Sequence, residues 1–223
     1  MKDVKDVDEL LEEYDQESSG SRKLVGLIGI IATIIAIGMS VFHLYTAGRG
    51  TLLSLRQRSL HIIFAFTLGF LLFPATKKGN KKKPSILDYV FIGLSLLIFG
   101  YLFIFVEEIA LKGGNMTTMD ILFGATAILL TLEITRRVVG PELPIVAIIF
   151  LLYARFGPYF PGELGHRGYS WSRIIGHMYF TLEGLLGIPI GVSATFVFMF
   201  LLFGAFLDKT GVGEFFINLA YSL

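Results

Sequence analysis

Glu133 and Arg137 are the charged residues whose spacing points most directly to a contact. They stand four positions apart near the end of an apolar segment, so a helix would place them on one face, where a carboxylate and a guanidinium can pair. One interpretation is a structural pair at the cytoplasmic boundary of a membrane span, with both side chains reaching the interface. The alternative is a buried functional acid, because ionisable residues inside spans often serve ion or substrate pathways.

Arg155 and His177 are two further candidate functional residues. Arg155 falls within the apolar segment 142–160, close to its end. An arginine inside a span is a functional candidate, but its long stem can also lift the guanidinium to the interface, and we favour this second interpretation. His177 falls on the polar face of an amphipathic segment, where we expect an ordinary interfacial residue.

Several kinds of site are excluded by residue type. The chain has no Cys, which rules out disulfides, thiolate metal sites and cysteine nucleophiles. It also has no Gly-x-x-x-x-Gly-Lys-Ser/Thr run to hold ATP phosphates. The histidines stand too far apart in sequence to predict a local metal motif: His43, His61, His166 and His177. We therefore assign no catalytic, substrate-binding or metal-binding residue, and we expect no cofactor, no enzymatic activity and no nucleic-acid partner.

The composition indicates an integral membrane protein. Of the 223 residues, 54% are hydrophobic, and 21 are Phe. This is more apolar than the usual soluble domain. The predicted fold is all-α, with about six transmembrane helices and one interfacial amphipathic helix in contact with the lipid bilayer.

Six apolar segments are long enough, or nearly so, to cross about 30 Å of hydrocarbon as helices. The segment 60–75 is short and the connection 48–59, predicted to lie outside, carries three arginines that argue weakly against that placement. The predicted spans are 24–45, 60–75, 86–106, 121–139, 142–160 and 192–207.

The lysine-rich run Lys77–Lys83 fixes the orientation of these spans. Its five lysines have no acid among them, and moving each charge across the membrane costs about 2.3 kcal/mol per 100 mV. The run is therefore expected in the cytoplasm, together with the acidic tail 1–23. Counting Lys and Arg up to residue 137 places eleven on the proposed inner side and four outside. We predict a multi-pass protein of the prokaryotic plasma membrane with a cytoplasmic N-terminus.

Beyond residue 166 the pattern changes. Apolar residues recur at helical spacing over 171–186, which predicts an amphipathic helix lying along the membrane surface. Gly187 and Gly191 interrupt the backbone before the last span, and their small-x-x-x-small spacing permits close helix approach. A further amphipathic helix is predicted to start at Glu214, and because the chain ends within it we interpret the sequence as the front part of a longer polypeptide.

Four local motifs carry a resemblance to a known family. The first three are Gly140-Pro141-Glu142-Leu143-Pro144, the run Phe156–Gly162 with sequence FGPYFPG, and the run Gly187–Thr195 with sequence GIPIGVSAT. The fourth is FGAFLDKTG at Phe203–Gly211. Together with the order of spans, these motifs resemble the fused permeases of tripartite ATP-independent periplasmic (TRAP) transporters of the TAXI type. The resemblance is weak over the first 120 residues and more specific from about Arg136 onward.

The resemblance implies a secondary transporter component. In that family an extracytoplasmic solute-binding protein delivers an organic acid, and cation entry, usually of sodium, drives its uptake. By analogy, residues 1–23 are a cytoplasmic tail, 24–139 a small-subunit-like region of four spans, 140–165 a linking span and 166–223 the start of a large-subunit-like region. The remainder of the large permease subunit is then a further partner.

The Gly/Ser/Thr-rich re-entrant hairpins that hold substrate and sodium in this family are absent from the sequence up to residue 223. No binding residue is therefore carried over, and these residues alone are expected to act as a scaffold. The alternative is a non-transporting membrane anchor or scaffold subunit of a larger complex, which is consistent with spans that have few charges and no continuous polar stripe.

Overall fold

The computed structural model describes residues 21–76, 83–111 and 115–222, and every regular element in these ranges is helical. The predicted positions of the acidic tail and of Lys77–Lys82 lie outside the described residues. Long apolar segments form helices here because, in a membrane, only internal hydrogen bonding can satisfy the backbone of a spanning segment. The first four helices are α3 (Gly26–Arg49), α4 (Ser54–Leu72), α5 (Ile86–Leu111) and α6 (Thr118–Val138).

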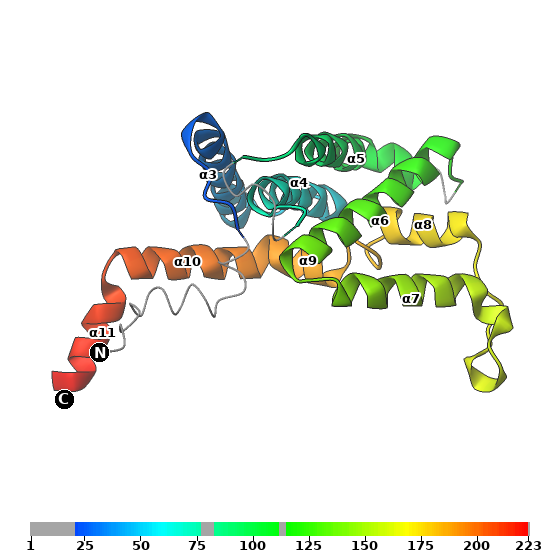
Figure 1. Cartoon of the computed structure of the whole chain (residues 1–223). Helices are drawn as coiled ribbons and strands as arrows, with labels where there is room; N and C mark the ends of the chain where they lie inside the picture. The colour runs from blue at the N-terminus through cyan, green and yellow to red at the C-terminus, as the bar shows by residue number, and fades with distance from the viewer. Residues whose placement is uncertain (1–20, 77–82, 112–114, 223) are drawn as a thin grey trace, which may run out of the picture.

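The second half of the chain is less compact. It comprises α7 (Glu142–Phe156), the short 3₁₀ turns η1 (Gly157–Tyr159) and η2 (Gly162–Leu164), α8 (Trp171–Phe180), α9 (Ile188–Val192), the π-helical turn η3 (Ser193–Val197), α10 (Phe198–Lys209) and α11 (Val212–Ser222). Figure 1 shows α9 beside the centre of the molecule, α10 extending away from it on the side opposite to α7, and α11 turning off at the end.

The core lies where α4, α5, α6 and α8 meet. α4 packs along α5, and α6 packs on both α5 and α8 (Figure 1). Gly124 of α6 permits the close approach of α8, since a Cβ there would lie 2.5 Å from Ile175 Cγ2. Tyr179 of α8 is fully buried beside Phe99, and its hydroxyl donates a hydrogen bond of 2.5 Å to the Ile98 carbonyl.

The outer surfaces of the helices are apolar and exposed, as expected of surfaces that face lipid. Five helical segments in the described ranges are long and apolar enough to cross a membrane: 26–49, 86–111, 118–138, 142–159 and 188–209. The all-α, multi-pass membrane class predicted from the composition is confirmed. The remaining predicted span, 60–75, corresponds to α4, which is helical but carries Arg56, Gln57 and Arg58 in its first turns and is not one of the five.

Two predicted boundaries were wrong. The connection 48–59 is mostly helical, because α3 continues to Arg49 and α4 already begins at Ser54. The amphipathic helix expected over 171–186 ends at Phe180 and is followed by turns. On its apolar face Ile174 and Ile175 are buried against neighbouring helices, whereas Trp171 is exposed. The amphipathic helix predicted near the end of the chain is present as α11.

Candidate functional site

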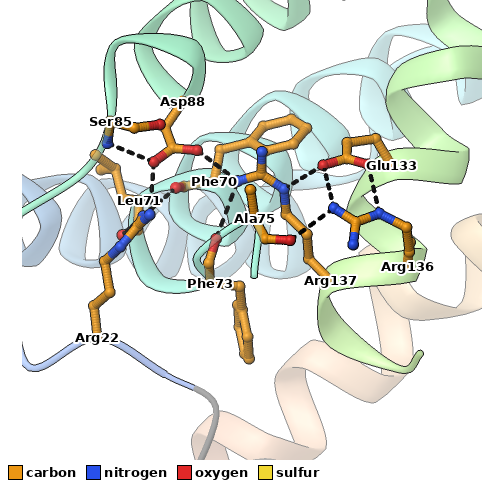
Figure 2. Close-up of polar contacts among 10 residues, drawn as sticks. All are labelled: Arg22, Phe70, Leu71, Phe73, Ala75, Ser85, Asp88, Glu133, Arg136 and Arg137. Atoms are coloured by element: carbon orange, nitrogen blue, oxygen red, sulfur yellow. Dashed lines mark hydrogen bonds and ion pairs between the residues drawn. The ribbon is translucent and has the colours of Figure 1, made fainter. Parts of the chain in front are cut away.

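A network of charged side chains joins four helix ends at one end of the helical bundle. Figure 2 shows Asp88 at the start of α5 between Arg22, which precedes α3, and Arg137, which lies near the end of α6. The last residues of α4 and the segment after it run through the same region. Since α3 and α5 begin here and α4 and α6 end here, the network lies on the side where the lysine-rich run joins α4 to α5.

Asp88 is the centre of the network and has no exposed surface. One carboxylate oxygen accepts a hydrogen bond from Arg137 Nη1 at 2.5 Å. The other accepts from Arg22 Nη2 at 2.7 Å and from the Ser85 backbone N–H at 2.7 Å. A fully buried carboxylate is tolerated only when its oxygens are paired and hydrogen-bonded, and these three bonds meet that condition.

Arg137 is also fully buried at its side chain. Besides Asp88 it contacts Glu133 at 2.7 Å and the Phe73 carbonyl at 3.1 Å. Its Nη2 has no hydrogen-bond partner in the part of the chain that the structure describes, but the guanidinium carbon lies 5.1 Å from the centre of the Phe70 ring and 5.3 Å from that of Phe91. Aromatic faces attract a cation at such distances, so the rings compensate in part for the missing hydrogen bond.

Glu133 connects the network to the edge of the bundle. Its two oxygens accept hydrogen bonds from Arg136 at 2.8 Å each, in addition to the contact with Arg137. The pairing of Glu133 with Arg137 predicted from their spacing is therefore confirmed. The guanidinium of Arg137 does not reach out to the interface, however, and turns inward to Asp88.

The same arginines also satisfy backbone carbonyls at the end of α4. Arg22 Nη1 donates to the carbonyls of Phe70 and Leu71 at 3.0 and 2.9 Å, and Arg136 Nη2 donates to the Ala75 carbonyl at 2.9 Å. Helix ends leave carbonyls unpaired, and cations are favourable at a helix C-terminus. The arrangement holds four helix ends in place, which is the chemistry of a structural clamp.

A second polar cluster, the histidine chain, lies toward the opposite end of α3 and α4. We use this name for His43 of α3, His61 of α4 and Ser193 of the π-helical turn η3. His43 Nε2 lies 2.9 Å from His61 Nδ1, and His61 Nε2 lies 3.1 Å from Ser193 Oγ. Both rings are buried, and the His43 ring stacks on Phe198 with their centres 4.2 Å apart. The histidine chain joins α3 and α4 to the helix that runs through η3 into α10.

Gln57 and Arg58 hold the neighbouring backbone. The buried Gln57 amide donates to Thr46 Oγ1 at 3.2 Å and to the Ala194 carbonyl at 3.3 Å, within the π-helical turn. Arg58 Nη1 donates to the Leu186 carbonyl at 2.6 Å. π-Helical turns are rare and frequently mark functional sites.

Gly191 lies where α9 packs on α4. A Cβ on Gly191 would lie 2.6 Å from Arg58 Nη2, so glycine leaves room for the guanidinium. The close helix approach predicted from the Gly187/Gly191 spacing is made by α4, through the Arg58 side chain at Gly191.

The other two candidates from the sequence join neither cluster. Arg155 Nε is buried without a hydrogen-bond partner among the described residues, and the guanidinium carbon lies 5.8 Å from the centre of the Phe156 ring. The His177 side chain is about half exposed and lies 3.9 Å from Glu183.

Asp88, His43 and His61 are the residues that sequence reasoning missed. Each is an ionisable residue within an apolar stretch of its helix, and that is the signal by which they could have been found. Their partners are distant in sequence and gave no local pattern. No group of three or more His, Asp or Glu residues suited to a metal ion occurs in the described ranges.

Comparison with known proteins gives one match, over less than half of the chain. The sequence matches no curated protein and no solved structure. Residues 126–223, from within α6 to the end, match the model of the family described as "Tripartite ATP-independent periplasmic transporter, DctM component". Over these residues the chain is similar to a transporter component, which supports a membrane permease of a TRAP transporter.

Proposed function

We propose that this chain is the permease part of a cation-coupled secondary transporter that takes up an organic acid delivered by an extracytoplasmic solute-binding protein. The observation that carries the proposal is the match of residues 126–223 to the DctM component. The resemblance of its motifs to those of fused TAXI-type permeases extends the proposal to sodium as the first candidate for the coupling ion, and to the remainder of a large permease subunit as a partner.

Within this transporter we assign residues 24–139 a scaffold role. The assignment is supported by the charged network, because an element that stays fixed while another moves needs its helix ends held together. Asp88, Arg137 and Glu133 do this between α5 and α6, and Arg22 extends the contact to the start of α3. Residues 140–165 are then a linking span, and 166–223 begin the part that resembles the large subunit.

The orientation proposed for the scaffold follows from charge. The clamp of Arg22, Asp88, Glu133, Arg136 and Arg137 lies at the helix ends adjoining the lysine-rich run. Lysines and arginines near span ends favour the cytoplasmic side of a membrane. We assign this end to the cytoplasm of a prokaryotic cell, with the tail 1–23 on the same side and the histidine chain toward the outside.

The proposal is tested by reconstituting the full-length gene product in liposomes with its binding protein. An inward sodium gradient is applied, and uptake of radiolabelled organic acids of several chemical classes is measured against an equal potassium gradient. We expect sodium-dependent uptake of at least one acid, and none without the binding protein.

Absence of uptake under sodium, potassium and proton gradients, from protein shown to be folded, would contradict the proposal. It would favour a membrane anchor or scaffold subunit instead. That alternative is supported by the fact that Asp88 and Arg137 are both buried and paired with one another, which suits a structural role.

A further inference from the structure

The histidine chain is a joint between two parts of the molecule. His43 and His61 belong to the predicted scaffold 24–139, and Ser193 belongs to the helix 188–209 beyond the linking span. Gln57 reinforces the joint through the Ala194 carbonyl, one residue after Ser193. The hydrogen bonds of this joint are therefore positioned to couple the two parts.

The donors and acceptors of the hydrogen bonds in the joint can be assigned. His43 Nδ1 lies 2.7 Å from the Met39 carbonyl, which can only accept, so this nitrogen carries a hydrogen. In a neutral ring His43 Nε2 is then an acceptor, and His61 Nδ1 must donate to it. His61 Nε2 is in turn an acceptor for the Ser193 hydroxyl. A neutral pair therefore carries the hydrogen of each ring on Nδ1.

One additional proton fits this geometry, and a second does not. With a proton on His61 Nε2, the His61 ring donates to His43 and to Ser193 Oγ, and the serine hydroxyl turns to donate elsewhere. With both rings protonated, His43 Nε2 and His61 Nδ1 are both donors, and their 2.9 Å hydrogen bond is lost.

The surroundings disfavour the charge while the joint stays closed. Ser193 of η3 and the Phe198 ring of α10 are the groups that face the two rings from the helix 188–209, and neither is an acid. α3 and α4 contain no acid, and Glu107 at the end of α5 pairs with Arg56 instead. The acid of α10, Asp208, lies ten positions beyond Phe198, roughly 15 Å away along a helix.

The nearest cation adds to this effect. Arg58 lies against the backbone at Gly191, two residues before Ser193. The remaining cations of the adjoining elements are Arg56 of α4, which pairs with Glu107, Arg49 at the end of α3 and Lys209 at the end of α10. A buried imidazolium without an acid and near a guanidinium is costly, and water entering between the helices relieves the cost.

From this geometry we propose that the His43–His61 pair is a proton-binding site, and that binding one proton opens the joint between α3–α4 and the helix 188–209. The closed joint holds while both rings are neutral, and it weakens as the pH falls. Acid favours opening because the charged form of the pair is stabilised by the hydrated, open arrangement and the neutral form by the closed one.

The first test reads the proton positions directly. Nitrogen NMR of histidine-labelled full-length protein in lipid nanodiscs distinguishes hydrogen on Nδ1 from hydrogen on Nε2. At about pH 8 we expect both His43 and His61 to carry it on Nδ1. As the pH is lowered from about 8 to about 4, through and below the range in which histidines in water change charge, we expect one proton to be gained by the pair, late in this range because burial disfavours the charged form.

His166 is the matched internal control for this measurement. Its Nε2 lies 3.2 Å from the Tyr153 carbonyl and its Nδ1 accepts from the Gly168 N–H at 3.1 Å, so it carries hydrogen on Nε2, the opposite arrangement. If His43 or His61 carries hydrogen on Nε2, or if the pair gains no proton or gains two, the proposal is overturned.

The second test measures whether α10 moves away from α3 when the pair is protonated. Because the chain has no Cys, spin labels can be placed on Val41→Cys of α3 and Leu201→Cys of α10, both exposed sites. We expect the distance between the labels to lengthen by at least ~2 Å on acidification, on the scale of interface helix shifts. His61→Gln, which retains a hydrogen-bonding side chain but does not titrate, should abolish this change, and His166→Gln should not.

An acid-induced change that persists in His61→Gln, or its absence in the otherwise unchanged protein, would overturn the proposal. If His61→Gln fails to fold, the nitrogen NMR of the protein with both histidines in place still decides between a proton-binding pair and an inert one.

Discussion

The two polar clusters lie toward opposite ends of the α3–α4 hairpin and differ in how they are built. At one end, Asp88 is enclosed by arginines and accepts charged hydrogen bonds on both oxygens. At the other, His43 and His61 contact each other on two helices, α3 and α4, that contain no acid. The charged cluster joins helices within the proposed scaffold, whereas the histidine chain joins the scaffold to the helix that follows the linking span.

The difference shows that a buried ion network and a buried neutral hydrogen-bond chain suit different roles. Breaking a buried ion network leaves an uncompensated charge, so such a network resists rearrangement. A neutral hydrogen-bond chain is weaker and can change its protonation state. A rigid end and an adjustable end are what a scaffold needs if it is to stay fixed and still communicate with a neighbouring part.

Replacing Asp88 by Ala should produce the largest loss of stability in this comparison. The buried Arg137 guanidinium loses its shortest ionic partner, and removing one member of a buried pair costs about 3–5 kcal/mol. The free energy of unfolding is measured by reversible unfolding in mixed micelles. Glu107→Ala is the control, because Glu107 is 71% exposed and its pair with Arg56 is worth no more than about 1 kcal/mol. Equal losses in the two variants would contradict the clamp.

Arg137→Lys keeps the positive charge but removes the planar fork. A lysine has one nitrogen where Arg137 uses Nε toward Glu133 and Nη1 toward Asp88 and the Phe73 carbonyl. We expect a loss of about 2–3 kcal/mol in the same unfolding measurement, since charged hydrogen bonds are worth about 1.5–3 kcal/mol each. A loss no larger than that of Arg136→Lys, on the exposed side of Glu133, would show that the fork does not matter.

His61→Phe should cost less than either change in the charged network. It leaves His43 Nε2 and the Ser193 hydroxyl without the partners they have at 2.9 and 3.1 Å. Only His43 Nε2 is a buried group left unpaired, since Ser193 is partly exposed, and one such neutral group costs about 1–3 kcal/mol. The measurement is made at alkaline pH, where the His43 and His61 rings are neutral. A loss larger than that of Asp88→Ala would reverse the comparison between a rigid and an adjustable end.

Tyr179→Phe is the smallest of the four effects. It removes only the hydroxyl that donates to the Ile98 carbonyl, while the ring stays packed on Phe99. A typical hydrogen bond contributes about 1 kcal/mol to stability, and the same unfolding assay measures it. A change as large as that of His61→Phe would mean that the core also depends on buried polar contacts.

The sequence predicted what depends on local composition. Apolar length identified the helices corresponding to 24–45, 86–106, 121–139, 142–160 and 192–207, and the four-residue spacing identified the pairing of Glu133 with Arg137. The contacts of Asp88 could not be predicted, because they depend on how helices distant in sequence pack. His43 and His61 lie 18 residues apart on two helices, and their contact depends on the register of the α3–α4 hairpin.

The start of α4 was misassigned for a related reason. Arg56, Gln57 and Arg58 gave the segment the polarity of a loop. In the folded protein Gln57 and Arg58 donate to carbonyls of the region Leu186–Ala194, so their polar atoms are satisfied inside a helix bundle. Side-chain polarity thus marked a helix–helix contact and not a connection.

Everything in this comparison depends on the two clusters lying toward opposite faces of the membrane. The absence of native Cys allows a direct measurement: Asn80→Cys, in the lysine-rich run, and Asn115→Cys, before α6, are each labelled in intact cells with a membrane-impermeant maleimide. We predict labelling of Asn115→Cys in intact cells and of Asn80→Cys only after the cells are lysed. Labelling of Asn80→Cys from outside, with Asn115→Cys protected, would contradict the assignment of the charged clamp to the cytoplasmic face.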